Sequence, residues 1–88
     1  MKFEWDERKN RANIRKHGVS FEEAREAFLD PQRKIRFNEK HSKREKRFFC
    51  FGKIGSQIMT VRFTMREANI RIIGAGYWRE GRKFYGKD

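Results

Sequence analysis

Three short runs of the chain, rich in aromatic and β-branched residues, predict three β-strands at 47–54, 57–64 and 69–76. The pair Gly55-Ser56 separates the first two runs, and two-residue pairs of this kind are typical of tight hairpin turns. A second turn, through 65–68, joins the second run to the third. The pattern therefore predicts an antiparallel meander.

Alternation within the second run divides its side chains between two faces of this sheet. One face takes the apolar side chains of Met59, Val61 and Phe63, and we expect it to lie in the core. The opposite face then carries three arginines, Arg47, Arg62 and Arg71.

The first residues predict a short strand followed by a helix. Residues 2–5 alternate, with Phe3 and Trp5 facing inward. Asp6 is suited to cap a helix that runs to about His17, and Gly18 can end it in a left-handed conformation. The apolar content of this helix is low, so we expect it on the surface, against one edge of the core.

A second helix is marked more strongly. Ser20 and Glu23 have the spacing of a capping box. Proline disfavours helical geometry in the residue before it, so Asp30-Pro31 should end the helix. One face of this helix is apolar and should enter the core, with Phe21, Ala24, Ala27 and Phe28.

The remaining segments complete an α+β fold. Residues 34–37 predict a strand, 38–46 a polar and mostly basic connection, and 77–85 a short helix weakened by Gly81. We therefore predict one domain, 1–88: a small antiparallel sheet built from the meander and the N-terminal strand, two N-terminal helices on one face, and a short C-terminal helix.

Composition adds a strong positive charge, with 23 Lys and Arg against 12 Asp and Glu, a net charge of +11. Such an excess favours phosphate backbones, an acidic protein or an anionic surface as partners. No apolar run approaches the roughly 20 residues that span a bilayer, and the first residues do not resemble a signal peptide. We therefore expect a cytoplasmic protein without a membrane association.

Cys50, the single cysteine, is expected to be a packed thiol.

Several short motifs, weak alone, occur together in a specific order: Phe3-Glu4-Trp5-Asp6-Glu7 with Lys9 and Asn13, then 16–24, His41-Ser42, Glu45-x-Arg47, Gly52, and Ile70-Arg71-Ile72-Ile73. In this order and spacing the sequence resembles the BrnT-type toxins over nearly its whole length. The chain departs from one common ending of that family, Ser-Ala-Arg-Lys-Ala, and has Gly74-Ala75-Gly76-Tyr77-Trp78 instead. Gly76 thus stands where an arginine is often found.

The resemblance implies a bacterial toxin of a type II toxin–antitoxin pair, with a fold similar to the RelE-type ribonucleases. It implies cleavage of RNA without a metal, inhibition of translation, and neutralisation by an antitoxin encoded beside the toxin. The antitoxin of such pairs resembles a ribbon-helix-helix DNA-binding protein. Operator DNA would then be contacted only through the complex.

RNA cleavage of this kind needs a group that takes the proton of the ribose 2′-OH, and a cation on the phosphoryl oxygens. Histidine titrates near neutrality, and arginine donates two parallel hydrogen bonds to a phosphate. We therefore expect catalytic roles for His17, Arg62 and Arg71. His41 is a weaker acid–base candidate, and Glu45 is the one carboxylate expected near the site besides the helix-capping glutamate.

Further basic and aromatic residues are expected to contact RNA: Lys16, Arg47, Arg66 and Tyr77. Trp78, which follows a strand, is expected to pack in the core. The sequence contains neither a metal-ligand spacing pattern nor a glycine-rich phosphate loop, so no metal and no cofactor are expected.

Other interpretations remain open for these residues. His17 and Lys16 could simply end a helix, and the strand arginines could lie on a solvated face. The protein would then be a non-catalytic basic module that binds nucleic acid, or an inactive toxin-like partner of an antitoxin.

Overall fold

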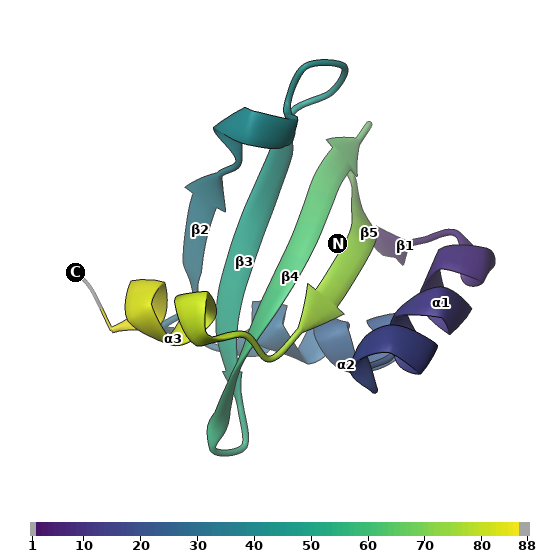
Figure 1. Ribbon diagram of the computed structural model, residues 1–88. Coiled ribbons are helices and arrows are strands. Elements are labelled where there is room, and N and C mark those ends of the chain that lie inside the picture. Colours follow the sequence, from purple (N-terminus) through teal and green to yellow (C-terminus); the bar gives the residue numbers. More distant parts are fainter. Residues whose placement is uncertain (1, 87–88) are drawn as a thin grey trace.

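The computed structural model describes residues 2–86 and has an α+β fold, with five strands in one mixed sheet (Figure 1). The sheet order is β1-β5-β4-β3-β2. Its strands are β1 (Lys2–Glu4), β2 (Lys34–Phe37), β3 (Arg47–Ile54), β4 (Gln57–Arg66) and β5 (Asn69–Gly76). The predicted meander is confirmed, because β2 to β5 pair consecutively and antiparallel.

The N-terminal strand is the exception, because β1 pairs parallel to β5, with Glu4 opposite Arg71. The expectation of a purely antiparallel sheet was therefore wrong. The reason is the helix α1 (Glu7–His17), which follows β1 directly and binds the far end of β5 through Asn13 and Ala75. Because β1 runs parallel to β5, the chain leaves β1 toward the end of β5 that α1 contacts.

Both ends of α1 are fixed as predicted. The carboxylate of Asp6 accepts a hydrogen bond from the Arg8 N–H at 2.8 Å, and Gly18 adopts φ +68° at the C-terminal end. The buried face of the helix is polar, however, and consists of Asn10 and Asn13. The helix is held to the sheet by side-chain hydrogen bonds to the backbone as well as by packing.

The second predicted helix forms with its capping box, but it tightens after one turn. It begins as α2 (Phe21–Ala24) and continues as the 3-10 helix η1 (Arg25–Leu29). This segment lies very close to β3: a Cβ built on Gly52 would be 2.1 Å from the carbonyl oxygen of Ala27. Glycine at 52 is therefore required for the helix layer to reach the sheet.

The core lies between these helices and one face of the sheet. Its members are the apolar residues predicted to face inward together with neighbours on β3, β5 and the helix layer: Val19, Phe21, Ala24, Ala27, Cys50, Met59, Val61, Phe63, Ile70, Ile72 and Ala75. The alternation predicted for β4 is confirmed by this set. No helix in the described part of the chain is long and apolar enough to cross a membrane.

Cys50 lies in this core, and burial raises the pKa of its thiol to about 12. The thiolate is the reactive form of cysteine, so the native protein should resist iodoacetamide at pH 8. In urea the same thiol should be alkylated within minutes. Mass spectrometry after a timed quench measures both rates, and rapid labelling of the native protein would contradict the packing described.

The opposite face of the sheet is covered at one end by α3 (Arg79–Tyr85), drawn in yellow in Figure 1. The short 3-10 turn η2 (Glu39–His41) lies between β2 and β3. Phe84 of α3 stacks on Phe51 with ring centroids 5.4 Å apart. Gly81, which weakens the helix in isolation, allows this approach, since a Cβ there would lie 2.3 Å from Thr60 Oγ1.

The far end of α3 is held by Asp30. Its carboxylate accepts a hydrogen bond from the Tyr85 hydroxyl at 2.6 Å and others from the backbone N–H groups of Lys53 and Gln32. The Tyr85 hydrogen bond, together with the two from the backbone, lowers the pKa of Asp30. The contact joins the last turn of α3 to the segment that follows η1.

This contact predicts a dependence of stability on pH. A carboxyl group whose folded-state pKa is lowered stabilises the protein above its unfolded value of about 3.9, and that contribution is lost as the pH falls below it. We expect Asp30→Asn to reduce the urea midpoint at pH 7, and the difference from the wild type to shrink below about pH 4. Urea titrations between pH 7 and pH 3 measure this. A difference that stays constant with pH would contradict the role given to Asp30.

Candidate functional site

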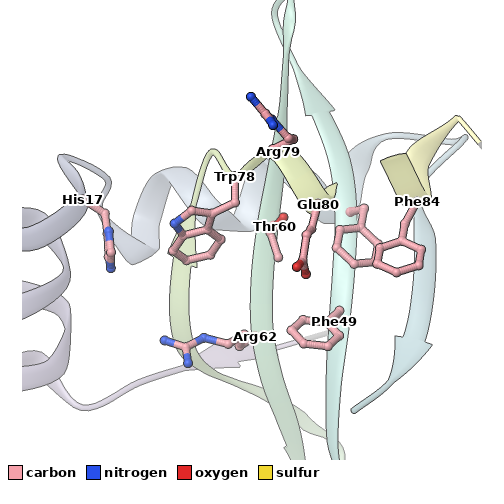
Figure 2. Close-up of a pocket in the computed structure, with 9 residues that line it drawn as sticks. His17, Phe49, Thr60, Arg62, Trp78, Arg79, Glu80 and Phe84 are labelled. Atoms are coloured by element: carbon pink, nitrogen blue, oxygen red, sulfur yellow. The ribbon is translucent and has the colours of Figure 1, made fainter. Parts of the chain in front are cut away.

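A cavity of about 500 Å³ lies between α3, the end of α1 and the sheet face opposite the core (Figure 2). It is lined by four aromatic rings, one imidazole, two guanidinium groups, one carboxylate and one hydroxyl-bearing side chain: Phe49, Phe51, Trp78, Phe84, His17, Arg62, Arg79, Glu80 and Thr60.

Strand register places the centre of this site in one row across the sheet. Arg36 on β2 pairs with Phe49 on β3, Phe49 pairs with Arg62 on β4, and Arg62 pairs with Gly74 on β5. Residues directly opposite one another project from the same face. The row therefore presents the guanidinium groups of Arg36 and Arg62, one on each side of the Phe49 ring, and it ends at Gly74.

Arg62 lies over that glycine. A Cβ built on Gly74 would be 2.2 Å from Nη2 of Arg62, so any larger residue at 74 would displace the guanidinium. Among the described residues Arg62 forms no ion pair, and its buried Nε has no hydrogen-bond partner. Burial, and then the neighbouring charge of Arg47, lower the pKa of Arg62. A bound anion would supply the partner that the protein does not.

Trp78 and His17 form the wall beside Arg62. The two rings meet edge to face with centroids 5.0 Å apart, and Figure 2 shows both side chains at the cavity. The expectation that Trp78 packs in the core was wrong. Its ring lies against the backbone of Gly76, where a Cβ would be 2.6 Å from Cζ2, so the absence of a side chain at 76 creates its position.

Glu80 is the residue that sequence reasoning missed. It lies in the first turn of α3, and its carboxylate points into the cavity (Figure 2). None of the ion pairs between described residues involves it. The expectation that Glu45 is the one carboxylate near the site besides the helix-capping glutamate was wrong, because α3 folds back over the sheet and brings Glu80 to the cavity. The signal available in the sequence was the helix-compatible segment after Gly76, although nothing local indicates where that helix packs.

The second predicted catalytic arginine, Arg71, lies on the same sheet face as Arg62 but outside the cavity. Its Nη1 is 2.8 Å from Oε2 of Glu4, and the other oxygen of that carboxylate, Oε1, accepts a hydrogen bond from the side-chain amide of Asn69. The hydrogen bond from Asn69 has the larger effect and that from Arg71 the smaller, and both lower the pKa of Glu4. Arg71 is therefore neutralised within the fold, while Arg62 is not.

The residues predicted to contact RNA are distributed around the site. Arg47 and Arg66 share Glu45, at 3.8 Å and 3.9 Å, so neither is an unpaired cation. Lys16 is exposed in the last turn of α1, next to the cavity residue at its end. Tyr77 does not line the cavity and its side chain is exposed; partial desolvation, and then the charges of two glutamates of the α2–η1 segment, raise its pKa.

The site is thus an aromatic cavity with a half-buried guanidinium, that of Arg62, at its floor, and with an imidazole, a carboxylate and the second guanidinium, Arg79, around it. Within residues 2–86 no group of three or more His, Cys, Asp or Glu side chains is placed to hold a metal ion. The chemistry available to these side chains is anion binding, stacking and proton transfer.

Comparison with known proteins gives a family. A family model described as "Ribonuclease toxin, BrnT, of type II toxin-antitoxin system" matches residues 5–81, which is most of the chain. Comparison with curated proteins finds no match. The match includes every residue of the cavity, from the end of α1 to the first turn of α3, except Phe84. The chain therefore belongs to the BrnT family of ribonuclease toxins of type II toxin–antitoxin systems.

Proposed function

We propose that this toxin is a metal-independent endoribonuclease whose site is the cavity around Arg62. The observation that carries the proposal is the unpaired, half-buried guanidinium over Gly74. Leaving a cation partly desolvated and beside another cation is costly, and such an arrangement is retained where it binds an anion. A phosphate of the RNA backbone is the anion that a ribonuclease toxin must hold.

In the proposed reaction the ribose 2′-oxygen attacks the adjacent phosphorus while the bond from phosphorus to the 5′-oxygen breaks. Arg62 stabilises the negative charge that accumulates on the phosphoryl oxygens. Glu80 accepts the proton of the 2′-OH, and His17 protonates the departing 5′-oxygen. The products are a 2′,3′-cyclic phosphate and a 5′-hydroxyl end. The fixed charge of Arg62 supplies the electrostatic stabilisation that a metal ion provides in other nucleases.

The peripheral cations serve affinity in this scheme. Lys16, and the net positive charge of Arg47 and Arg66 around their shared Glu45, attract the RNA backbone, whereas Arg71 is paired with Glu4 and contributes only if RNA displaces that carboxylate. Tyr77 keeps a stacking role only for RNA that extends beyond the cavity toward the helix layer. Cleavage of cytoplasmic messenger RNA would inhibit translation, and a ribbon-helix-helix antitoxin would neutralise the toxin and bring the complex to operator DNA.

A second candidate function is supported by the altered ending of the chain. Gly76 and Trp78 stand where the common family ending has arginine and alanine. Loss of that arginine favours a toxin-like protein that binds RNA, or an antitoxin, without cleaving RNA. Both candidate functions use the same cavity, but only the first requires it to cleave RNA.

The deciding experiment is co-expression with the neighbouring gene product, release of the toxin under denaturing conditions, refolding, and an assay on labelled RNA in EDTA. We expect cleavage that leaves cyclic phosphate ends, detected by their resistance to phosphatase until acid treatment. Arg8→Gln, a change at an exposed arginine on α1, should retain this activity. Binding of RNA without cleavage in EDTA would support the second candidate instead.

A further inference from the structure

The cavity around Arg62 does not end at α3. A second cavity of about 640 Å³ adjoins it over β2 and η2, and the two share Phe49, Glu80 and Phe84 as a common wall. Of the shared residues, Phe49 lies between Arg62 and Arg36 in the row already described, and Glu80 and Phe84 lie above it on α3. We call these two adjoining cavities, which lie side by side over β2, β3 and β4, the groove.

The second cavity has the side chains that a nucleotide requires. The guanidinium of Arg36 lies over the Phe84 ring at 4.0 Å from its centroid. None of the ion pairs between described residues engages Arg36, so its charge is available to a ligand. Lys40 and His41 line the same cavity on η2. The Phe84 ring also stacks on Phe51, so it supports the Arg36 guanidinium and does not itself take a base. The supported guanidinium can bind a phosphate or stack on a base.

The spacing also suits consecutive nucleotides. Arg36 and Arg62 are separated by two strand intervals, which corresponds to about 10 Å between their Cα atoms. Phe49 lies between them on the same face. Two flexible cations at this separation can contact neighbouring phosphates while the intervening base lies against the aromatic wall. A duplex would not expose its base faces to this wall, whereas a single strand does.

We propose that the cavity beside Arg36 is a further nucleotide subsite, so that the substrate is single-stranded RNA in which the nucleotide next to the scissile dinucleotide occupies this part of the groove. This inference rests on the proposed ribonuclease function and identifies the form of its substrate. His41, which was considered as an acid or base for cleavage, becomes in this scheme a contact of the neighbouring nucleotide.

The test uses short oligonucleotides in which one ribose has a free 2′-OH and all others are 2′-O-methylated, so that each has one cleavable bond. The minimal substrate is a dinucleotide, and two trinucleotides extend it by one residue on the 5′ or the 3′ side. We expect one extension to raise kcat/KM by about 10-fold, as for a base stacked on an aromatic side chain, and the other to have little effect.

Variants assign the gain to the second cavity. Arg36→Gln and Phe84→Leu should each reduce the ratio of kcat/KM for trinucleotide over dinucleotide to about one-fold. Arg8→Gln removes the same charge as Arg36→Gln on exposed α1 and should retain the ratio. A ratio near one in the wild type, or an unchanged ratio in both variants of the second cavity, would overturn the inference.

Binding separates this inference from the proposed catalysis. Fluorescence anisotropy with fully 2′-O-methylated oligonucleotides of two, three and four residues needs no cleavage. We expect affinity to rise with length up to the size of the groove, and Arg36→Gln to reduce the slope of log K against log salt by about 0.7, the value for one phosphate contact on a single strand. Length-dependent binding without cleavage would contradict the nuclease but support the subsite. Cleavage combined with an affinity that does not change with length would support the nuclease and contradict the subsite.

Discussion

Arg62→Met should lower kcat/KM for RNA cleavage by about 10³-fold, because it removes the half-buried guanidinium at the floor of the cavity, which forms no ion pair with any described residue. The same change should leave the free energy of unfolding unchanged or higher. Arg62 is half-buried without a carboxylate and lies beside Arg47, and both conditions lower its pKa. Methionine fills similar space over Gly74 without an uncompensated charge.

Arg71→Met is the matched comparison, since Arg71 projects from the same face but is bound to Glu4 at 2.8 Å. We expect this variant to lose stability, because Glu4 is left without its cation, and to lose less activity than Arg62→Met. Urea denaturation and single-turnover cleavage of labelled RNA measure the two effects on the same preparations. Equal losses of activity, or a clear loss of stability in Arg62→Met, would refute the assignment of the anion site to Arg62.

Asn13→Ala should lower the free energy of unfolding by about 3 kcal/mol, the largest loss that we expect from one polar side chain. The Asn13 amide donates hydrogen bonds to the carbonyl oxygens of Val19 and Ala75, both at 2.9 Å, and accepts one from the Ala75 N–H at 3.2 Å. All of these groups are buried. Alanine would leave them without partners and would detach α1, which carries His17 at its end, from β5.

Lys9→Ala, an exposed change on the same helix, controls for helix propensity and should alter stability by no more than about 0.5 kcal/mol. Denaturant titrations of both variants, followed by circular dichroism, provide the comparison. A loss below about 1 kcal/mol in Asn13→Ala would mean that water replaces the amide, and that packing alone attaches α1.

Features of the fold that depend on short-range signals could be predicted from the sequence. Ser20 with Glu23 forms the capping box, Gly18 adopts the left-handed conformation, and Gly55 has φ +62° in the hairpin turn. The parallel pairing of β1 could not be predicted, because it depends on where α1 binds β5 through Asn13. Nothing in residues 2–5 encodes that direction.

Of the residues predicted for the site, His17 and Arg62 line the cavity, whereas Arg71 does not, and the other walls were not predicted. Strand alternation placed Arg62 on the face opposite the core, and position at a helix end singled out His17. Glu80 and Trp78 enter the site through the packing of α3 and through the space above Gly76, both of which are contacts between distant parts of the chain. Sequence patterns reveal the periodicity of single helices and strands, whereas contacts between distant segments leave no periodic signal in the sequence.

The contact between Trp78 and Gly76 couples these two positions of the chain. The tryptophan packs against a backbone that has no Cβ at 76, so any side chain introduced at 76 would force the ring out of its present place. Because that ring forms the wall of the cavity with His17, beside Arg62, a side chain at 76 would also open this wall. A larger residue fits at 76 only together with a smaller one at 78, so the two positions can be exchanged only as a pair.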